Sequence, residues 1–441
     1  MMHSNRMLLA AATLLTLTLT ACYSMQNLEA LASCADADES LKPAARIDSC
    51  TAFIESGKPS SGDLAIALVD RGAAYAALGS EDRALQDFDR ALALKPDSVL
   101  ALLNRGNVYV HKGDYDRAIK DYDRVIELKP DYASAFVDRG NAYLHKGADD
   151  RAIQDYDQAI KLKPDFAFAF QNRGNAYLHK GADDHAIQDY DQAIKLRPDV
   201  ASVYHARGRA YADQGSYDRA IEDYDRALGV KSGSDYVNQG AFSRLFHGYD
   251  YGMGLQTDEV SVLIDRGRAY QLKGDYDRAL QDYDQAIKLR PDYVRVLYLR
   301  GVSYTSKGLY DRAIEDYTQA LKVAPDFSAA LNGRCWARAT ANEDLEAALA
   351  DCNESLRRHP NDAQALECRA LVWLRMGQFD KAVQDTDAAL TGHPRSSSGL
   401  FTRGVAKRRL GDVRAGDADL ATARSIEPNV DTRFTHYGVH P

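Results

Sequence analysis

Histidines that could bind a metal recur at a fixed interval along the chain. His111, His145 and His179 are spaced 34 residues apart. Ligands of one ion must lie within a few ångströms of it. Equivalent residues on stacked helical repeats are about 10 Å apart. We therefore expect these histidines to be exposed surface residues and predict no metal site.

Acidic triplets recur at the same interval and allow two interpretations. Asp121–Asp123 and its copies offer carboxylate ligands of the kind that Ca²⁺ prefers. Alternatively, these carboxylates pair with Arg105, Arg139 and the equivalent arginines on neighbouring helices. The sequence favours ion pairs, because Lys and Arg are interleaved with Asp and Glu throughout the chain.

The sequence carries no motif for catalysis. It lacks a Gly-x4-Gly-Lys-Ser/Thr phosphate loop, a GxSxG nucleophile elbow, a GxGxxG after a strand and an HExxH pair. The net charge of −9, without a local basic stripe, argues against a nucleic-acid partner. We therefore predict a non-enzyme with no catalytic residue, no cofactor and no small-molecule substrate.

These side chains belong to a repeat that opens on an arginine, usually followed by glycine. Most steps are 34 residues, and a fixed period of this length indicates a solenoid. We predict five repeats over 65–228, an insertion at 229–259, five repeats over 260–430 and a C-terminal tail at 431–441. The arginines that open the ten copies are Arg71, Arg105, Arg139, Arg173, Arg207, Arg266, Arg300, Arg334, Arg369 and Arg403.

Each copy predicts two helices joined by a turn. In Val99–Tyr132, apolar residues recur at helical spacing up to Lys112 and Gly113, which break the helix. A second apolar face follows and stops at Pro130. The apolar face of this helix pair is too large for one repeat to bury alone, so each repeat must be covered by its neighbour.

The repeat resembles the tetratricopeptide repeat (TPR) family over about 340 residues. The resemblance implies an all-α superhelical solenoid that works as a non-catalytic scaffold for proteins or extended peptides. It rests on an alanine in the second helix at Ala84, Ala118, Ala152, Ala186, Ala220, Ala279, Ala313, Ala348 and Ala382. An aromatic residue follows four positions later at Phe88, Tyr122, Tyr156, Tyr190, Tyr224, Tyr283 and Tyr317.

The resemblance also implies a peptide-binding groove lined by the first helices. An amide can both donate to and accept from an extended main chain. The alternative is that the asparagines are solvated polar residues on a copied repeat. Val137 and Gln171 stand where a carboxylate clamp would need lysine, and Asp138 replaces an asparagine, so that clamp is not expected. The residues carried over by position are Asn104, Asn107, Asn141, Asn172 and Asn175.

Four of the six cysteines occupy equivalent places in the repeat. Cys335 stands at the small first-helix position and Cys352 at the aromatic position of the second helix; Cys34 and Cys50 are separated by the usual 16-residue interval. We predict disulfides Cys34–Cys50 and Cys335–Cys352, each stabilising by roughly 3 kcal/mol, with a degenerate N-terminal cap at 22–63. The alternative is that these cysteines are small buried hydrophobes. Cys368 is expected to be buried and inert.

The first 21 residues resemble the signal peptide of a bacterial lipoprotein. An apolar stretch too short to span a bilayer ends in Leu19, Thr20, Ala21 and Cys22, the pattern of a lipobox. We predict lipidation of Cys22 and a location on the periplasmic side of the outer membrane. The alternatives are ordinary cleavage after Ala30–Ala32, giving a soluble product, and a second lipobox at Leu31–Cys34.

Two functions follow for such a chain. The first is a membrane-anchored periplasmic adaptor that holds partner proteins in the groove of its repeats. The alternative is a structural subunit of an outer-membrane or secretion assembly, docked through the insertion 229–259 or the ends of the solenoid. The insertion carries aromatic residues among Gly and Ser, which suits a partner-binding loop or a linker.

Overall fold

The computed structural model describes residues 34, 42–56, 59–230 and 258–441. The predicted signal peptide, Cys22 and nearly all of the insertion lie outside these residues. The described part is built of helices with no strand, which confirms the predicted all-α class. None of its helices is long and apolar enough to span a membrane.

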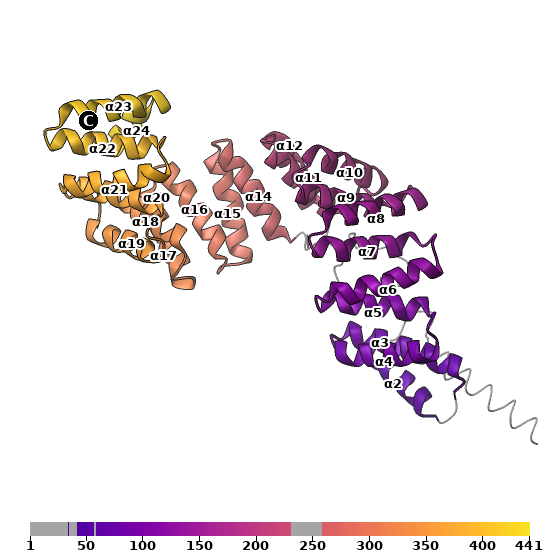
Figure 1. Ribbon diagram of the computed structural model, residues 1–441. Coiled ribbons are helices and arrows are strands. Elements are labelled where there is room, and N and C mark those ends of the chain that lie inside the picture. Colours follow the sequence, from indigo (N-terminus) through magenta and orange to yellow (C-terminus); the bar gives the residue numbers. More distant parts are fainter. Residues whose placement is uncertain (1–33, 35–41, 57–58, 231–257) are drawn as a thin grey trace, which may run out of the picture. The chain divides into compact units, whose positions relative to one another are not determined.

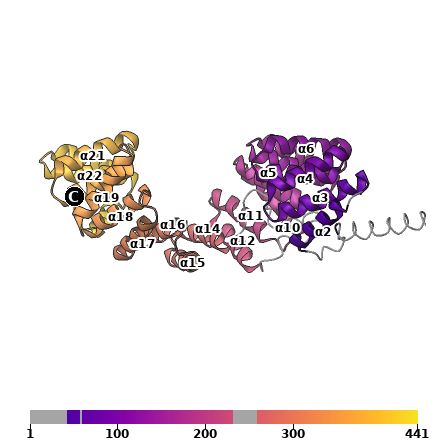
Figure 2. The same ribbon diagram turned by 90° about the horizontal axis from the view of Figure 1, so that it is seen from below.

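The described helices fall into two units. One consists of Met1–Gly215 with Asp225–Thr257, the other of Ser216–Tyr224 with Asp258–Pro441, so that α12 is shared. Within each unit the helices stack in the order of the sequence (Figure 1 and Figure 2). The first set is α2 (Pro43–Glu55), α3 (Ser61–Ala77), α4 (Glu81–Leu94), α5 (Val99–His111), α6 (Tyr115–Leu128), α7 (Ala133–His145), α8 (Asp149–Leu162), α9 (Ala167–His179), α10 (Asp183–Leu196), α11 (Ala201–Asp213) and α12 (Tyr217–Gly229). The second set is α14 (Glu259–Leu272), α15 (Tyr276–Leu289), α16 (Val294–Ser306), α17 (Tyr310–Val323), α18 (Ser328–Ala341), α19 (Leu345–Arg358), α20 (Ala363–Arg375), α21 (Phe379–Gly392), α22 (Ser397–Arg409), α23 (Val413–Ile426) and α24 (Val430–His436).

The ten predicted repeats are the helix pairs from α3/α4 to α11/α12 and from α14/α15 to α22/α23. Nearly every first helix ends before a glycine in the left-handed region, such as Gly113 with φ of 75°, whereas α18 ends before Asn342 with φ of 58°. In the second repeat, Asp114 then starts the second helix, because its side chain accepts a hydrogen bond from the Arg117 amide. Pro130 follows the end of α6 by two residues and prevents its continuation.

Within most repeats a glycine of the first helix contacts the aromatic ring of the second. A Cβ added at Gly140 would lie 2.6 Å from Cε1 of Tyr156, so no larger residue fits without displacing the ring. Tyr156 is fully buried between its own repeat and the next. This close approach explains why glycine and the aromatic recur together in the sequence.

Both predicted disulfides are present in the structure. Cys335 and Cys352 are bonded, and so are Cys34 and Cys50. Cys335 and Cys352 stand where other repeats have the glycine and the aromatic ring, so the covalent bond replaces that contact. Cys368 is a free, buried thiol, and burial raises its pKa far above the ordinary value, which keeps it protonated and unreactive.

Most of the arginines that open a repeat join two second helices. Arg139 donates through Nε and Nη2 to the carboxylate of Asp155 in its own repeat, at 2.9 and 2.6 Å. Its Nη1 donates to Asp123 of the preceding repeat at 2.6 Å. The predicted pairing of the acidic triplets with arginine is therefore confirmed. Hydrogen bonding to Asp155 raises the pKa of Arg139, whereas burial raises the pKa of Asp155.

The residues predicted as a tail contain one more helix. Val430 and Phe434 of α24 are fully buried, and the helix contacts α22 and α23 of the last repeat. The sequence boundary at 431 therefore divides a helix that the structure keeps whole.

Replacing Arg139 by alanine should lower the free energy of unfolding by about 2–3 kcal/mol, because the buried Asp155 carboxylate loses its bidentate partner. Urea denaturation followed by circular dichroism measures the change. Lys146→Ala is the matched control, since its pair with Asp116 is more exposed and should contribute less than about 1 kcal/mol. Equal losses in the two variants would contradict a structural role for the arginine series.

Candidate functional site: the face of the first helices

The first helices of successive repeats lie against one another in both units. Contacts join α3 to α5, α5 to α7, α7 to α9 and α9 to α11, and likewise α14 to α16 and on to α22. Among the second helices other than α12, no such contacts join one to the next in the described part of the chain. The first helices therefore form a continuous inner row in each unit, here called the first-helix face.

The asparagines predicted to line this face are mostly inside the fold. Asn107 is half-buried. Direct contact of a ligand with these amides stays a prediction. In the structure, however, most of the amides are not exposed on the surface of the face. The buried ones, with their exposed fractions, are Asn104 (1%), Asn141 (3%), Asn172 (1%) and Asn175 (6%).

These amides hold the tyrosines that pack against the glycines. The hydroxyl of Tyr156 donates to Oδ1 of Asn141 at 2.7 Å, and the hydroxyl of Tyr190 donates to Oδ1 of Asn175 at 2.8 Å. Asn172 of the next repeat donates to the same Asn141 oxygen at 3.1 Å. The asparagines thus link successive first helices, a role that the sequence analysis did not assign to them.

Two of the amides keep an unused hydrogen-bonding atom. Oδ1 of Asn104 and Nδ2 of Asn141 are buried with no partner in the described part of the chain. An unsatisfied buried polar atom costs about 1–3 kcal/mol. A water molecule, or a ligand after a small local opening, would satisfy these atoms, so they mark one place where the face can accept and one where it can donate a further hydrogen bond.

Apolar side chains are the exposed part of this face in the first repeats. Ile66 and Leu100 are each 48% exposed. Ser202 occupies their place in its own repeat and accepts a hydrogen bond from Gln171 of the preceding first helix at 3.1 Å. That bond shows that this place borders the first-helix face. Ile66 and Leu100 were not predicted from the sequence. The signal that could have found them is an apolar residue at a place where another copy of the repeat has serine.

Asp138 stands on the same face at the place where the neighbouring repeats have Asn104 and Asn172. Burial raises the pKa of its carboxyl to about 7. Asp70, at the same place in the first repeat, has a pKa raised to about 6 by burial, and Arg46 opposes this shift. These two carboxyls therefore carry a proton below neutral pH.

The three histidines are exposed, as predicted. His111 pairs with Glu81, and His179 lies 3.3 Å from Asp149. The ring of His145 stacks on Tyr115 with centroids 5.3 Å apart. No three His, Cys, Asp or Glu side chains of the described ranges come together as a metal site would need.

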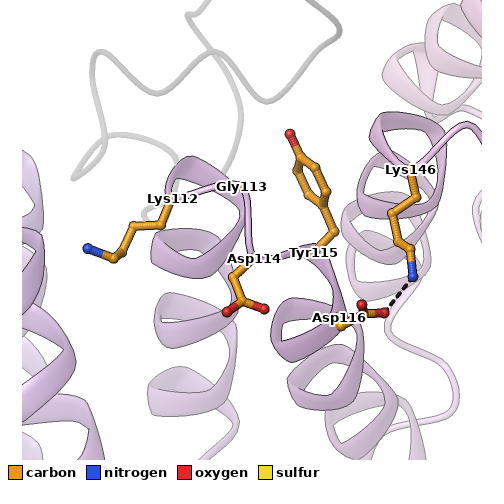
Figure 3. A pocket seen from close by; sticks show the side chains of 6 residues that line it. All are labelled: Lys112, Gly113, Asp114, Tyr115, Asp116 and Lys146. Carbon is orange, nitrogen blue, oxygen red and sulfur yellow. Dashed lines mark hydrogen bonds and ion pairs between the residues drawn. The ribbon is translucent and has the colours of Figure 1, made fainter.

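A shallow hollow of about 280 Å³ lies between the turns of the second and third repeats (Figure 3). Its charges are already paired, because Lys146 binds Asp116 at 2.5 Å and Lys112 binds Asp82 at 3.1 Å. A charged ligand would therefore have to compete with these ion pairs. The residues that line it are Lys112, Gly113, Asp114, Tyr115, Asp116 and Lys146.

Family models match most of the repeats. Models described as TPR repeat match residues 72–113, 106–147, 140–181, 174–215 and 267–308. Models described as tetratricopeptide repeat match residues 201–233, 294–327 and 338–399. Together they cover well over half of the chain. The chain belongs to the tetratricopeptide repeat family. TPR folds are generally non-catalytic scaffolds for interactions between proteins.

Solved structures of TPR proteins are similar to this chain. A tetratricopeptide repeat protein from Parabacteroides merdae is 18% identical, matched over 63% of this chain and 99% of that one, with a TM-score of 0.47. MamA is 27% identical over 38% and 92%, with a TM-score of 0.35. Yeast Tom70 is 14% identical over 94% and 95%, with a TM-score of 0.40. No curated protein sequence matches the chain.

Asp138→Asn should remove a pH dependence of stability. The folded pKa of about 7 lies above the unfolded value of 3.8, so the folded state holds the proton more tightly between these values. The stabilisation is complete below pH 3.8 and is lost as the pH rises to about 7. The variant should therefore be more stable than the parent at pH 8, by on the order of 2 kcal/mol, and nearly equal to it at pH 4.

Urea denaturation at both pH values measures this difference. Asp131→Asn removes an exposed charge from the turn just before α7 and should leave the difference between the two pH values unchanged. If the difference in stability between the parent protein and Asp138→Asn is the same at pH 4 and pH 8, the pKa of Asp138 is not raised.

Proposed function

We propose that this TPR protein is a lipid-anchored adaptor of the bacterial cell envelope that holds extended segments of partner proteins on its first-helix face. The observation that carries the proposal is the pair of exposed apolar residues Ile66 and Leu100 on a face that otherwise consists of packed helices. Family membership supports a protein partner, and the absence of catalytic motifs from the sequence is consistent with an adaptor.

An extended segment suits this face for a geometrical reason. Equivalent places recur once per repeat, so side chains spaced along one extended chain could meet Ile66, Leu100 and, two repeats farther on, Phe168. Asn104 and Asn141 beneath them have one spare acceptor and one spare donor, which could pair with main-chain groups after a small local opening. Apolar side chains then provide affinity, and the amides fix the register.

The proposed location rests on the N-terminal sequence and on the cysteines. The lipobox pattern ending in Cys22 would attach the chain to a membrane through buried acyl groups, each CH₂ contributing about 0.8 kcal/mol. Disulfides persist in oxidising compartments such as the periplasm. The bonds Cys34–Cys50 and Cys335–Cys352 therefore support export of the chain.

The double variant Ile66→Ser, Leu100→Ser should lower the recovery of crosslinked partners from the cell envelope at least tenfold. Leu94→Ser, Leu196→Ser is the matched control, because these leucines end second helices and are 41% and 38% exposed. Quantitative mass spectrometry of crosslinked complexes compares the two. The groove proposal fails if both variants recover the same partners equally.

The same experiment separates the adaptor from a docked structural subunit. A chain that lacks residues 231–257 should keep its partners if the first-helix face binds them. Loss of the partners from this deletion, while Ile66→Ser, Leu100→Ser retains them, would favour docking through the insertion.

Cys22→Ala should abolish incorporation of a fatty-acid probe and move the protein from the membrane fraction to the soluble fraction. The reason is that the thiol of Cys22 is the proposed site of acylation, and no other anchor is proposed. Metabolic labelling followed by fractionation measures both effects, with Cys368→Ala as the control because that thiol is buried. Unchanged labelling of Cys22→Ala would exclude this anchor.

A further inference from the structure

The C-terminal segment, residues 430–441, lies on the first-helix face of the last repeats. The ring of Phe434 stacks on Phe401 of α22 with centroids 4.3 Å apart. Tyr437 meets Trp336 of α18 edge-on at 6.1 Å. The segment therefore extends from the last repeat to α18, the first helix of the repeat two places earlier in the chain.

Arg375 of α20 binds the main chain of this segment. Its Nη2 donates to the carbonyl oxygen of Tyr437, and its Nη1 donates to that of Gly438 at 3.4 Å. Nη2 also donates to the carbonyl oxygen of Thr340 in α18 at 3.3 Å. No carboxylate in the described ranges pairs with Arg375, and burial lowers its pKa. This arginine thus uses its donors on backbone carbonyls, in contrast to the arginines that open the repeats.

The contacts extend beyond what is needed to cover the end of the solenoid. Phe434 and Val430, both fully buried, cover the last repeat. His436 and Tyr437 continue past it, and Nε2 of His436 lies 3.5 Å from the place of a Cβ at Gly308, between α16 and α17. A short helix that lies across several repeats, with the carbonyl groups just past its C-terminus held by an arginine, occupies this face as a bound helical peptide would.

Gly438 is adapted to this path. Its φ of 73° lies in the left-handed region, and an added Cβ would be 3.7 Å from Nη1 of Arg375. A residue with a side chain would be strained here because of the positive φ, although its Cβ would make only an ordinary contact with the guanidinium. Val439 follows and is 6% exposed, so the chain returns to an apolar contact after the turn.

We propose that the first-helix face of α18, α20 and α22 is a peptide-binding site that the C-terminal segment occupies in cis. Its ligand in trans is a peptide with two aromatic residues three positions apart, followed by glycine and an aliphatic residue. The aromatic rings of the ligand pack against Phe401 and Trp336, and Arg375 donates hydrogen bonds to its main-chain carbonyl groups. This site is distinct from Ile66 and Leu100 and does not depend on a lipid anchor.

Occupation in cis makes the site self-blocking. A tethered segment has an effective concentration in the millimolar range, which a free ligand must overcome. The apparent affinity for the ligand is reduced in proportion to the fraction of chains whose site is open. Release of the segment would therefore switch binding on.

The test uses the whole chain with a protease site inserted between Pro428 and Asn429, cut after folding. A fluorescent synthetic peptide of residues 429–441 is added, and anisotropy measures its binding. We expect the cut chain, after exchange of its own segment, to bind the peptide at least tenfold more tightly than the uncut chain. If the cut chain stays folded and neither releases the segment nor binds the peptide, the segment is a fixed cap and the proposal is wrong.

Matched peptides and one further chain make the result specific. The peptide with Phe434→Ala and Tyr437→Ala, and the peptide with Gly438→Val, should each bind at least tenfold more weakly. A chain that ends at Asn429 should bind the parent peptide without cutting, and Arg375→Gln in that chain should weaken binding at least tenfold. Equal binding of parent and altered peptides would also overturn the proposal. Ile66→Ser, Leu100→Ser should leave this binding unchanged, so its failure is separable from that of the adaptor function.

Discussion

The pairing of one arginine with two aspartates underlies the rest of this structure. Arg139 binds Asp155 of its own repeat and Asp123 of the preceding one. Arg173 and Arg300 make the same two kinds of bond. Because a TPR repeat cannot bury its apolar face alone, each repeat must meet the next in a defined register. Bidentate hydrogen bonds supply that register, since they require fixed positions of both partners.

The packing inside most repeats depends on a close contact between a glycine and an aromatic ring, which leaves no room for a larger residue in place of the glycine. Gly140 leaves room for the ring of Tyr156, whose hydroxyl then reaches Asn141. Where cysteines replace glycine and ring, as at Cys335 and Cys352, a covalent bond spans the same gap. The repeats near the C-terminus thus depart from the repeat pattern without losing the link between their two helices.

The same face of the solenoid appears in two states in the two units. In the first unit it exposes Ile66 and Leu100 above buried amides. In the second it is covered by the chain's own C-terminal segment, which Arg375 holds by its carbonyl groups. There Phe434 stacks on Phe401, Tyr437 meets Trp336 edge-on, and Arg375 binds main-chain carbonyl groups, which a peptide of any sequence carries.

The sequence by itself determined the repeat, its helices and the pairing of its charges. The period, the turn glycines and the stop at Pro130 are local signals, so the helix pairs and the pairing of the repeated aspartates with arginines could be predicted from the sequence. The particular partners of Arg139 come from the structure. The positions of Cys34–Cys50 and Cys335–Cys352 followed from the same spacing. Only the tertiary structure decided that Asn104 and Asn172 are buried and that residues 430–441 fold back onto α18 and α20. Burial depends on how neighbouring repeats approach one another, and the contact of Arg375 with Tyr437 joins residues that are 62 positions apart. A periodic sequence pattern cannot predict this contact, because the C-terminal segment occurs only once. The repeat also does not indicate which residues cover the first-helix face.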